Sequence, residues 1–157
     1  MAGLLMHLDS VCMFTLPLDA CYPRNAKDTS NASVWACWST ENKEAPLGLC
    51  SSERGEFKVE VRTFDGTANP YLGLAAILGA GLTGLKEQAA LEMRQCSSGG
   101  SGLTEDRRRE LRIMTKMPTQ NAIFEPGLEE RMQFINSWLP EMAWKLYKSV
   151  REVILSP

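Results

Sequence analysis

Residues 57–64, with the sequence FKVEVRTF, alternate between two kinds of position. Positions 57, 59 and 61 are apolar, whereas positions 58, 60 and 62 are Lys, Glu and Arg. A period of two places successive side chains on opposite faces of a β-strand. The alternation therefore predicts a strand over 57–64 with one apolar face and one charged face.

The longest apolar stretch runs from Tyr71 to Leu85 and predicts a helix. Pro70 suits the first helical position, and Asn69 before it is a typical N-cap. Because the stretch is apolar nearly all round, we expect burial on several sides. Four of its residues are glycine, each of which costs a helix up to ~1 kcal/mol relative to Ala. We therefore expect a neighbouring backbone to approach this helix closely.

Shorter patterns predict further strands and loops. VWACW at 34–38 is short and rich in β-branched and aromatic side chains, which is typical of a buried strand. Residues 47–50 fit a second short strand. Residues 18–33, rich in Asp, Asn, Ser and Pro, and the SSGGSG segment at 97–102 predict loops.

Helix-start signals recur later in the chain. Thr104 is followed by Glu105 and Asp106, and a Thr N-cap with early acidic residues stabilises a helix N-terminus. Two more helices are predicted after Glu125. With the strands above, these patterns predict an α+β protein.

Composition and charge narrow the class of protein. The 157 residues suggest one domain. The net charge of -2 excludes a nucleic-acid binder that works by bulk positive charge. The Arg run at 107–109 is flanked by acidic residues, so we interpret it as a solvated helix face and not as an anion site, the alternative reading. No apolar stretch reaches the ~20 residues of a membrane span.

The cysteines point to a reducing compartment. There are five, with no CxxC spacing, and His7 is the single histidine. A structural zinc site needs close-spaced Cys/His pairs, so buried reduced thiols are the better interpretation. The N-terminal stretch lacks the basic region of a signal peptide. We therefore expect a cytoplasmic protein.

Glu60 and Arg62 carry the candidate chemistry. They share one face of the predicted strand, roughly 7 Å apart along it, which we take as too far for an ideal direct ion pair. The carboxylate could bind a hard divalent cation, and the guanidinium could bind a carboxylate or phosphate in a bidentate manner. The alternative is a solvated outer face of a half-buried strand.

The segment from Val59 to Gln88 resembles the C-terminal signature of glutamine synthetases. That signature has an acidic residue, an apolar residue and Arg on a strand, then D-x-x-x-N-P-Y and a long Ala/Gly/Leu-rich helix. Residues 14–24 resemble the family's F-T-x-P-x-x-x-S-Y-x-R segment, and residues 34–50 resemble the strand and loop with its N-R-x-x-x-x-R pattern. The sequence T-E-N-K-E-A-P at 40–46 is most similar to that of fungal glutamine-synthetase-like proteins.

The resemblance implies a fold and a domain assignment. Residues 7–155 would form the C-terminal part of the catalytic domain, without the N-terminal β-grasp domain and the first barrel strands. The implied fold is a partial catalytic barrel. In it, a few antiparallel strands pack on a long buried glycine-rich helix, with C-terminal helices following.

The resemblance also implies residue roles. Glu60 falls on a ligand of Mg²⁺ or Mn²⁺, and Arg62 falls on the arginine that contacts the substrate glutamate. Asn42 and Lys43 fall on the N-R motif, with Asn42 on the substrate side and Lys43 facing the nucleotide phosphates. In the family reaction, ATP phosphorylates the γ-carboxylate of glutamate. Ammonia or an amine then displaces phosphate. The implied partners are glutamate, ammonia or an amine, ATP and further copies of the chain.

Two departures from the family pattern affect the expected function. Lys43 replaces an arginine and loses its planar fork. Gly48 stands where the second arginine belongs, which either makes room for a different substrate or marks relaxed selection. With the first barrel strands absent, we expect the chain alone to be inactive. The alternative is a non-catalytic remnant that acts as a binding or assembly module.

Overall fold

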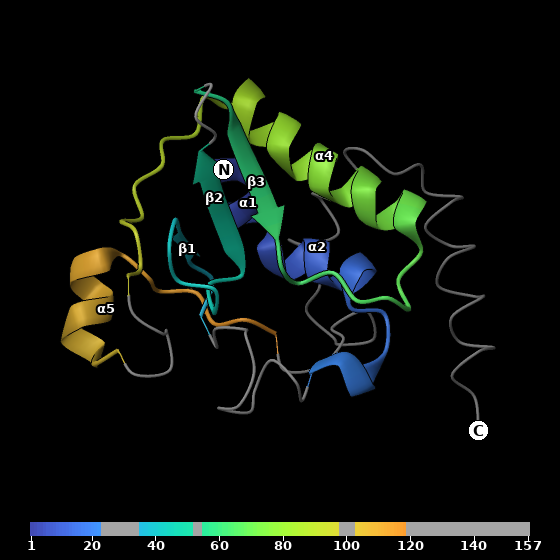
Figure 1. Ribbon diagram of the computed structural model, residues 1–157, viewed down its shortest axis with the longest axis horizontal. Helices are drawn as coiled ribbons and strands as arrows, with labels where there is room; N and C mark the ends of the chain where they lie inside the picture. The colour runs from blue at the N-terminus through green and yellow to red at the C-terminus, as the bar shows by residue number, and fades with distance from the viewer. Residues whose placement is uncertain (23–34, 52–54, 98–102, 119–157) are drawn as a thin grey trace.

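The computed structural model describes residues 1–22, 35–51, 55–97 and 103–118 (Figure 1). Within these ranges the α+β class is confirmed by four α-helices and a three-stranded sheet. The helices are α1 (Ala2–Met6), α2 (Leu8–Thr15), α4 (Pro70–Lys86) and α5 (Glu105–Leu111), and a 3-10 turn spans Asp19–Cys21. The strands are β1 (Trp38–Ser39), β2 (Leu47–Ser51) and β3 (Phe57–Val61). The helices predicted after Glu125 and most of the loop predicted over 18–33 lie outside the described residues.

The sheet has the order β1-β2-β3. The β2–β3 pair is antiparallel, as expected, whereas β1 runs parallel to β2. The strand predicted over 34–38 is mostly wrong, because only Trp38 of that segment joins the sheet. Trp35 forms an isolated antiparallel bridge with Lys116, and the Ala36 amide donates to the Thr115 carbonyl over 2.9 Å. The backbone at the start of this segment therefore pairs with residues 115–116, and the backbone at its end pairs with β2.

The main core of the described residues lies between the N-terminal helices and α4. Both α1 and α2 pack against α4. Leu8, Val11 and Phe14 of α2 are at most 1% exposed. The apolar residues of 4–16, for which the pattern predicted no element, thus supply about half of the buried side chains of this core.

The start of α4 confirms the capping prediction. The Asn69 side-chain oxygen accepts hydrogen bonds from the amides of Tyr71 and Leu72, over 3.0 and 3.2 Å, and Pro70 begins the helix. These contacts satisfy two amide groups that have no partner inside the helix.

The predicted burial of α4 on several sides is wrong. Its buried positions are small residues, including Gly73, Ala76 and Gly84. Ala80 and Gly84 meet Gly3 of α1, whereas Gly73 lies against the ring of Phe64. The large apolar side chains on the other side are between 54% and 84% exposed, namely Tyr71, Leu74, Leu78, Leu82 and Leu85. Overall apolarity predicts that a helix can be buried, but the packing of small residues decided which face of α4 is covered.

The predicted burial of the cysteines is confirmed for four of the five. Cys50 is exposed and the other four are buried. Among the described residues, no helix combines the length and apolarity needed to cross a bilayer.

Candidate functional site

The candidate site is built on β3 and its neighbour β2. Glu60 lies on β3, and Arg62 follows directly after the strand ends at Val61. The register places Gly48 of β2 opposite Glu60. Directly opposed residues of an antiparallel pair project to the same face, so Gly48 belongs to the face that Glu60 and Arg62 share.

Glu60 and Arg62 form a direct ion pair. The Nε and Nη2 atoms of Arg62 donate to Oε2 of Glu60, over 3.0 and 2.8 Å. Our expectation that the two groups lie too far apart is therefore wrong. It considered only the strand rise, whereas the guanidinium folds back across the space left by Gly48. A Cβ at Gly48 would lie 2.5 Å from Nη2 of Arg62.

Arg62 also holds a turn that precedes β2. Its Nη1 donates to the carbonyl of Asn42 over 2.7 Å and to the carbonyl of Ala45 over 3.2 Å. We call these contacts, together with the Glu60 pair, the Arg62 network. The side chain of Arg62 is 15% exposed and that of Glu60 is 55% exposed, so the network lies at the surface with its guanidinium largely covered.

The turn at 39–45 is ordered by its own side chains as well. Oγ of the buried Ser39 accepts from the amides of Glu41 and Asn42, over 3.2 and 2.9 Å. Oδ1 of Asn42 accepts from the Glu44 amide over 2.9 Å. Lys43 is exposed within this turn. Two anchors, Ser39 and Arg62, thus fix the backbone on either side of Lys43.

The structure brings together three of the four predicted site residues. Asn42, Glu60 and Arg62 are in one network, and the Asn42 atom that meets Arg62 is its backbone carbonyl. Lys43 lies on the same turn. Sequence reasoning missed Ser39 and the steric role of Gly48. A Ser three residues before Asn42 is a signal for a side-chain-capped turn, but the effect of Gly48 needs the strand register.

The D-x-x-x-N-P-Y segment after β3 has a structural role in this chain. Oδ1 of Asp65 accepts from the amide and the hydroxyl of Thr67, over 2.9 and 2.6 Å. The Asp65 amide donates to the Thr15 carbonyl over 2.9 Å. With Asn69 capping α4, the D-x-x-x-N-P-Y segment fixes the connection between β3 and α4 and so the direction of both.

The described residues do not by themselves form a divalent-cation site. In the parts of the chain that the structure describes, no group of three or more His, Cys, Asp or Glu side chains could hold a metal. Glu60 is a single carboxylate, and one of its oxygens already accepts from Arg62. A site for Mg²⁺ normally needs octahedral oxygen coordination, so Glu60 could be only one of several ligands.

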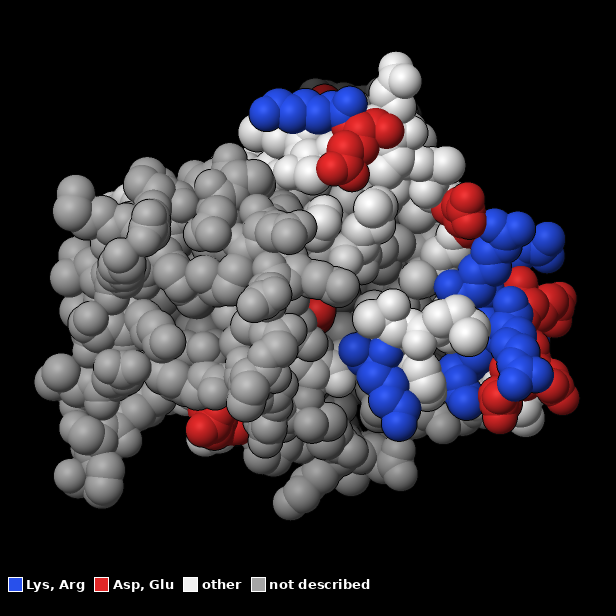
Figure 2. Space-filling model, turned by 180° about the vertical axis from the view of Figure 1, so that it is seen from behind, with Lys and Arg blue, Asp and Glu red and all other residues white. Residues whose placement is uncertain are grey.

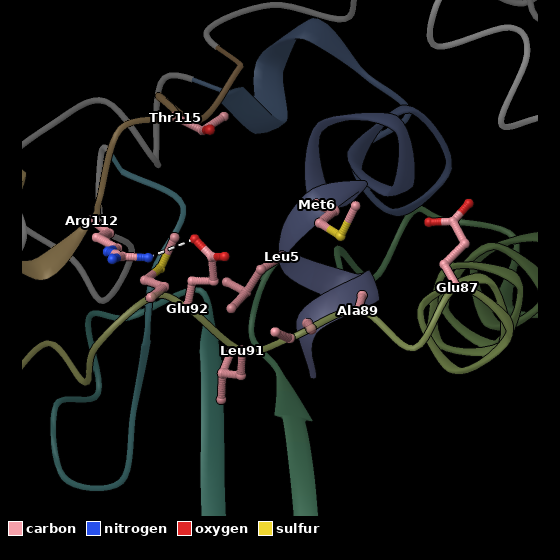
Figure 3. A pocket seen from close by; sticks show the side chains of 11 residues that line it. Leu5, Met6, Glu87, Ala89, Leu91, Glu92, Arg112 and Thr115 are labelled. Atoms are coloured by element: carbon pink, nitrogen blue, oxygen red, sulfur yellow. Dashed lines mark hydrogen bonds and ion pairs between the residues drawn. The ribbon is translucent and has the colours of Figure 1, made fainter.

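A cavity of about 470 Å³ lies apart from this network (Figure 3). Its walls come from α1, from residues 87–93 and from residues 112–115. An ion pair between Arg112 and Glu92, at 2.6 Å, lies beside it. None of the predicted site residues lines this cavity. It therefore adds nothing to the chemistry of Glu60 and Arg62.

The Arg run on α5 is a solvated helix face, as predicted. Arg107 pairs with Glu110, and Arg109 pairs with Glu105. Arg108 lies over the ring of Trp35, 4.3 Å from its centroid. Figure 2 shows basic and acidic side chains interleaved on one side of the molecule. The pairing of opposite charges argues against an anion site here.

The described residues thus combine an ion pair at the end of β3, a turn fixed beside it and an Asn-capped helix, α4, in an α+β domain. The family described as "Glutamine synthetase, catalytic domain" matches residues 1–153. The chain belongs to this family.

Its relatives include enzymes and one protein whose name states no reaction. It is 41% identical over 129 residues to Protein fluG of Emericella nidulans, a match that covers 82% of this chain and 14% of that protein. It is 36% identical over 94 residues to Gamma-glutamylpolyamine synthetase GlnA3 of Streptomyces coelicolor, covering 57% and 20%. A match to the glutamine synthetase of Staphylococcus aureus strain MW2, 31% identical over 129 residues, covers 75% and 28%. The chain therefore spans less than a third of these relatives.

A solved structure has the same fold. The crystal structure of a novel glutamine synthase homolog superposes with a TM-score of 0.64 at 24% identity, and the match covers 98% of this chain and 33% of that one. This likeness supports the fold assignment.

Proposed function

We propose that this chain supplies one part of the active site of a cytosolic ATP-dependent ligase. The ligase would join ammonia or an amine to the γ-carboxylate of glutamate through a γ-glutamyl phosphate. The observation that carries the proposal is the Glu60–Arg62 pair, fixed on β3 directly before an Asn-capped α4 in a member of the glutamine synthetase family. Since the chain spans a small part of its relatives, the remaining groups would come from residues outside the described ranges.

Each site residue has a role that suits its chemistry. The guanidinium of Arg62 would bind the substrate carboxylate, for which a planar fork is the best protein partner. The exposed ammonium of Lys43 would meet the phosphates of ATP, and Asn42 would contact the substrate. Glu60 would be one ligand among several for Mg²⁺ or Mn²⁺. Because Nε and Nη2 of Arg62 both donate to Oε2 of Glu60, Arg62 must leave Glu60 to bind a substrate carboxylate in this way. Glu60 could ligate a cation through its other carboxylate oxygen without that change.

The proposed reaction has two steps. A γ-carboxylate oxygen of glutamate attacks the γ-phosphorus of ATP, and ADP leaves. The nitrogen of ammonia or an amine then attacks the acyl carbon, inorganic phosphate leaves and the nitrogen loses a proton. Positioning and positive charge supply most of the catalysis of phosphoryl transfer, and Lys43 and Arg62 are the cations among the four candidate site residues.

A chimera tests the proposal. This chain would replace the matching segment of the Staphylococcus aureus glutamine synthetase, and γ-glutamyl hydroxamate formation would be measured with ATP and Mg²⁺. We expect activity reduced by roughly 10²–10³, as for loss of one transition-state donor, because Gly48 contributes no cation. We expect Arg62→Ala to abolish this activity and the isolated chain to show none. Turnover by the isolated chain, or a folded chimera with no activity, would contradict the proposal.

A non-catalytic binding or assembly module is the second candidate. The observation in its favour is that four hydrogen bonds of Arg62 go to groups within the chain. Titration of the chimera with ATP in the presence and absence of Mg²⁺ separates the two candidates. The ligase requires Mg²⁺-dependent binding, whereas the module predicts none.

A further inference from the structure

Gly48 lies at the centre of the Arg62 network without contributing a side chain to it. Its partner across the β2–β3 pair is Glu60. A Cβ at position 48 would lie 2.5 Å from Nη2 of Arg62 and 3.0 Å from Oε2 of Glu60. Real side-chain carbons do not approach other atoms as closely as 2.5 Å, so any other residue here must move the guanidinium.

We propose that Gly48 is a positioning residue for Lys43, acting through Arg62. The missing side chain lets the guanidinium lie over β2, where it bridges Glu60 and the carbonyls of Asn42 and Ala45. This bridge holds the turn that presents Lys43. The importance of Lys43 for phosphate binding rests on the proposed function, whereas the steric relation between Gly48 and Arg62 does not.

If Gly48 positions Arg62, the expected effect of the Gly48→Arg substitution changes. The resemblance suggests that Gly48→Arg restores a missing cation. In this structure the new side chain would enter the space of the Arg62 guanidinium, break the hydrogen bonds to Asn42 and Ala45, and release the turn. The site is therefore organised around the glycine and is not simply weakened by it.

The fold should tolerate such a change. The atom that meets the added Cβ is the end of a flexible arginine side chain and not backbone. Arg62 can swing outward toward solvent, since the Glu60 side chain beside it is 55% exposed. A small substitution thus separates the effect on the network from the effect on folding.

Gly48→Ala is the direct test, with the ¹H–¹⁵N signal of Arg62 Nε–Hε and amide hydrogen exchange as measurements. We expect the Nε–Hε signal to move to the position of a free arginine. We expect exchange at the Ala45 amide, which donates to the Asn42 carbonyl over 3.3 Å, to rise roughly 5- to 10-fold for loss of a supporting hydrogen bond. Gly66→Ala is the matched control, because no atom lies within 4 Å of the Cβ it adds.

Arg62→Lys shows whether Gly48 acts through Arg62. Lysine keeps the charge but cannot bridge Glu60 and two carbonyls, so exchange at Ala45 should rise without any change at position 48. Adding Gly48→Ala to Arg62→Lys should then raise exchange no further. An unchanged Arg62 signal in Gly48→Ala, or an equal rise in exchange with and without Arg62, would overturn the inference.

A titration with ATP and Mg²⁺ separates this inference from the proposed function. If the chimera that carries the unmutated chain binds ATP, Gly48→Ala in that chimera should weaken the binding several-fold. Gly66→Ala should leave the binding unchanged. Absence of ATP binding by the wild type would contradict the proposed function. The signal of Arg62 and the exchange at Ala45 would still decide the role of Gly48.

Discussion

The backbones of Gly3 and Gly84 touch where α1 crosses α4. A Cβ at Gly84 would lie 2.6 Å from both N and Cα of Gly3, and a Cβ at Gly3 would lie 2.3 Å from the Ala80 carbonyl oxygen. The close approach predicted from the glycines of α4 is therefore confirmed at Gly84. Glycine is required here because the neighbouring atoms belong to backbone, which cannot move aside as a side chain can.

Gly84→Ala should destabilise the fold by about 1–3 kcal/mol, the usual cost of overpacking a contact. Gly81→Ala lies on the same helix, but its Cβ would meet no atom within 4 Å, so it should stabilise by up to ~1 kcal/mol through helix propensity. Urea unfolding of both variants measures the difference. If both variants destabilise the fold, or both stabilise it, the close contact assigned to Gly84 and Gly3 would be contradicted.

Asn69→Ala should lower the free energy of unfolding by about 1 kcal/mol, within the range known for N-caps. The variant loses the acceptor for the amides of Tyr71 and Leu72. Asn69→Asp is the control, because a carboxylate accepts the same hydrogen bonds and suits the helix N-terminus. If Asn69→Asp and Asn69→Ala lower the free energy of unfolding equally, Asn69 does not stabilise the fold by capping α4.

Local sequence signals predicted the elements that carry the site. The alternation of 57–64 identified β3, and Asn69 with Pro70 identified the start of α4, because capping and strand alternation depend on neighbouring residues alone. The placement of Glu60 and Arg62 on one face followed from the same alternation.

Contacts between elements could not be predicted in this way. The Glu60–Arg62 pair depends on Gly48 being opposite Glu60, and that register involves residues 12 positions apart. The covered face of α4 depends on α1 and α2, whose sequence shows no clean helical period. The predicted metal, substrate and nucleotide roles of Glu60, Arg62, Asn42 and Lys43 remain predictions for the experiments above.

The free energy of unfolding should decrease as the pH is lowered, because of His7, which lies between α1 and α2. Burial lowers the pKa of His7 below its usual 6.5, although Glu87 and Asp9 act in the opposite direction. The unfolded chain then binds the proton more tightly than the folded one. The contribution of neutral His7 is complete above pH 6.5 and is lost as the pH falls through the lower, folded-state pKa.

Urea unfolding at several pH values between about 7.5 and 5 measures this effect, since most carboxylates titrate below that window. His7→Gln cannot be protonated, so the free energy of unfolding of this variant should depend less on pH over the same range. A wild type and variant with parallel pH profiles would show that His7 does not cause the loss.

Cys50 and Cys12 should differ strongly in reactivity toward iodoacetamide. Cys50 is exposed on β2, whereas Cys12 is fully buried and burial raises its pKa to about 12. At pH 8 a thiol with that pKa is deprotonated in about one molecule in 10⁴, and the thiolate is the reactive form. Peptide mapping of the native protein should therefore find Cys50 modified first and Cys12 only after unfolding in urea.

Cys50→Ser should remove the fast phase of modification and leave the slow phase unchanged. Modification of Cys12 at the rate of Cys50 would mean that α2 opens readily, and the core between α2 and α4 could not then be the stable part of the fold.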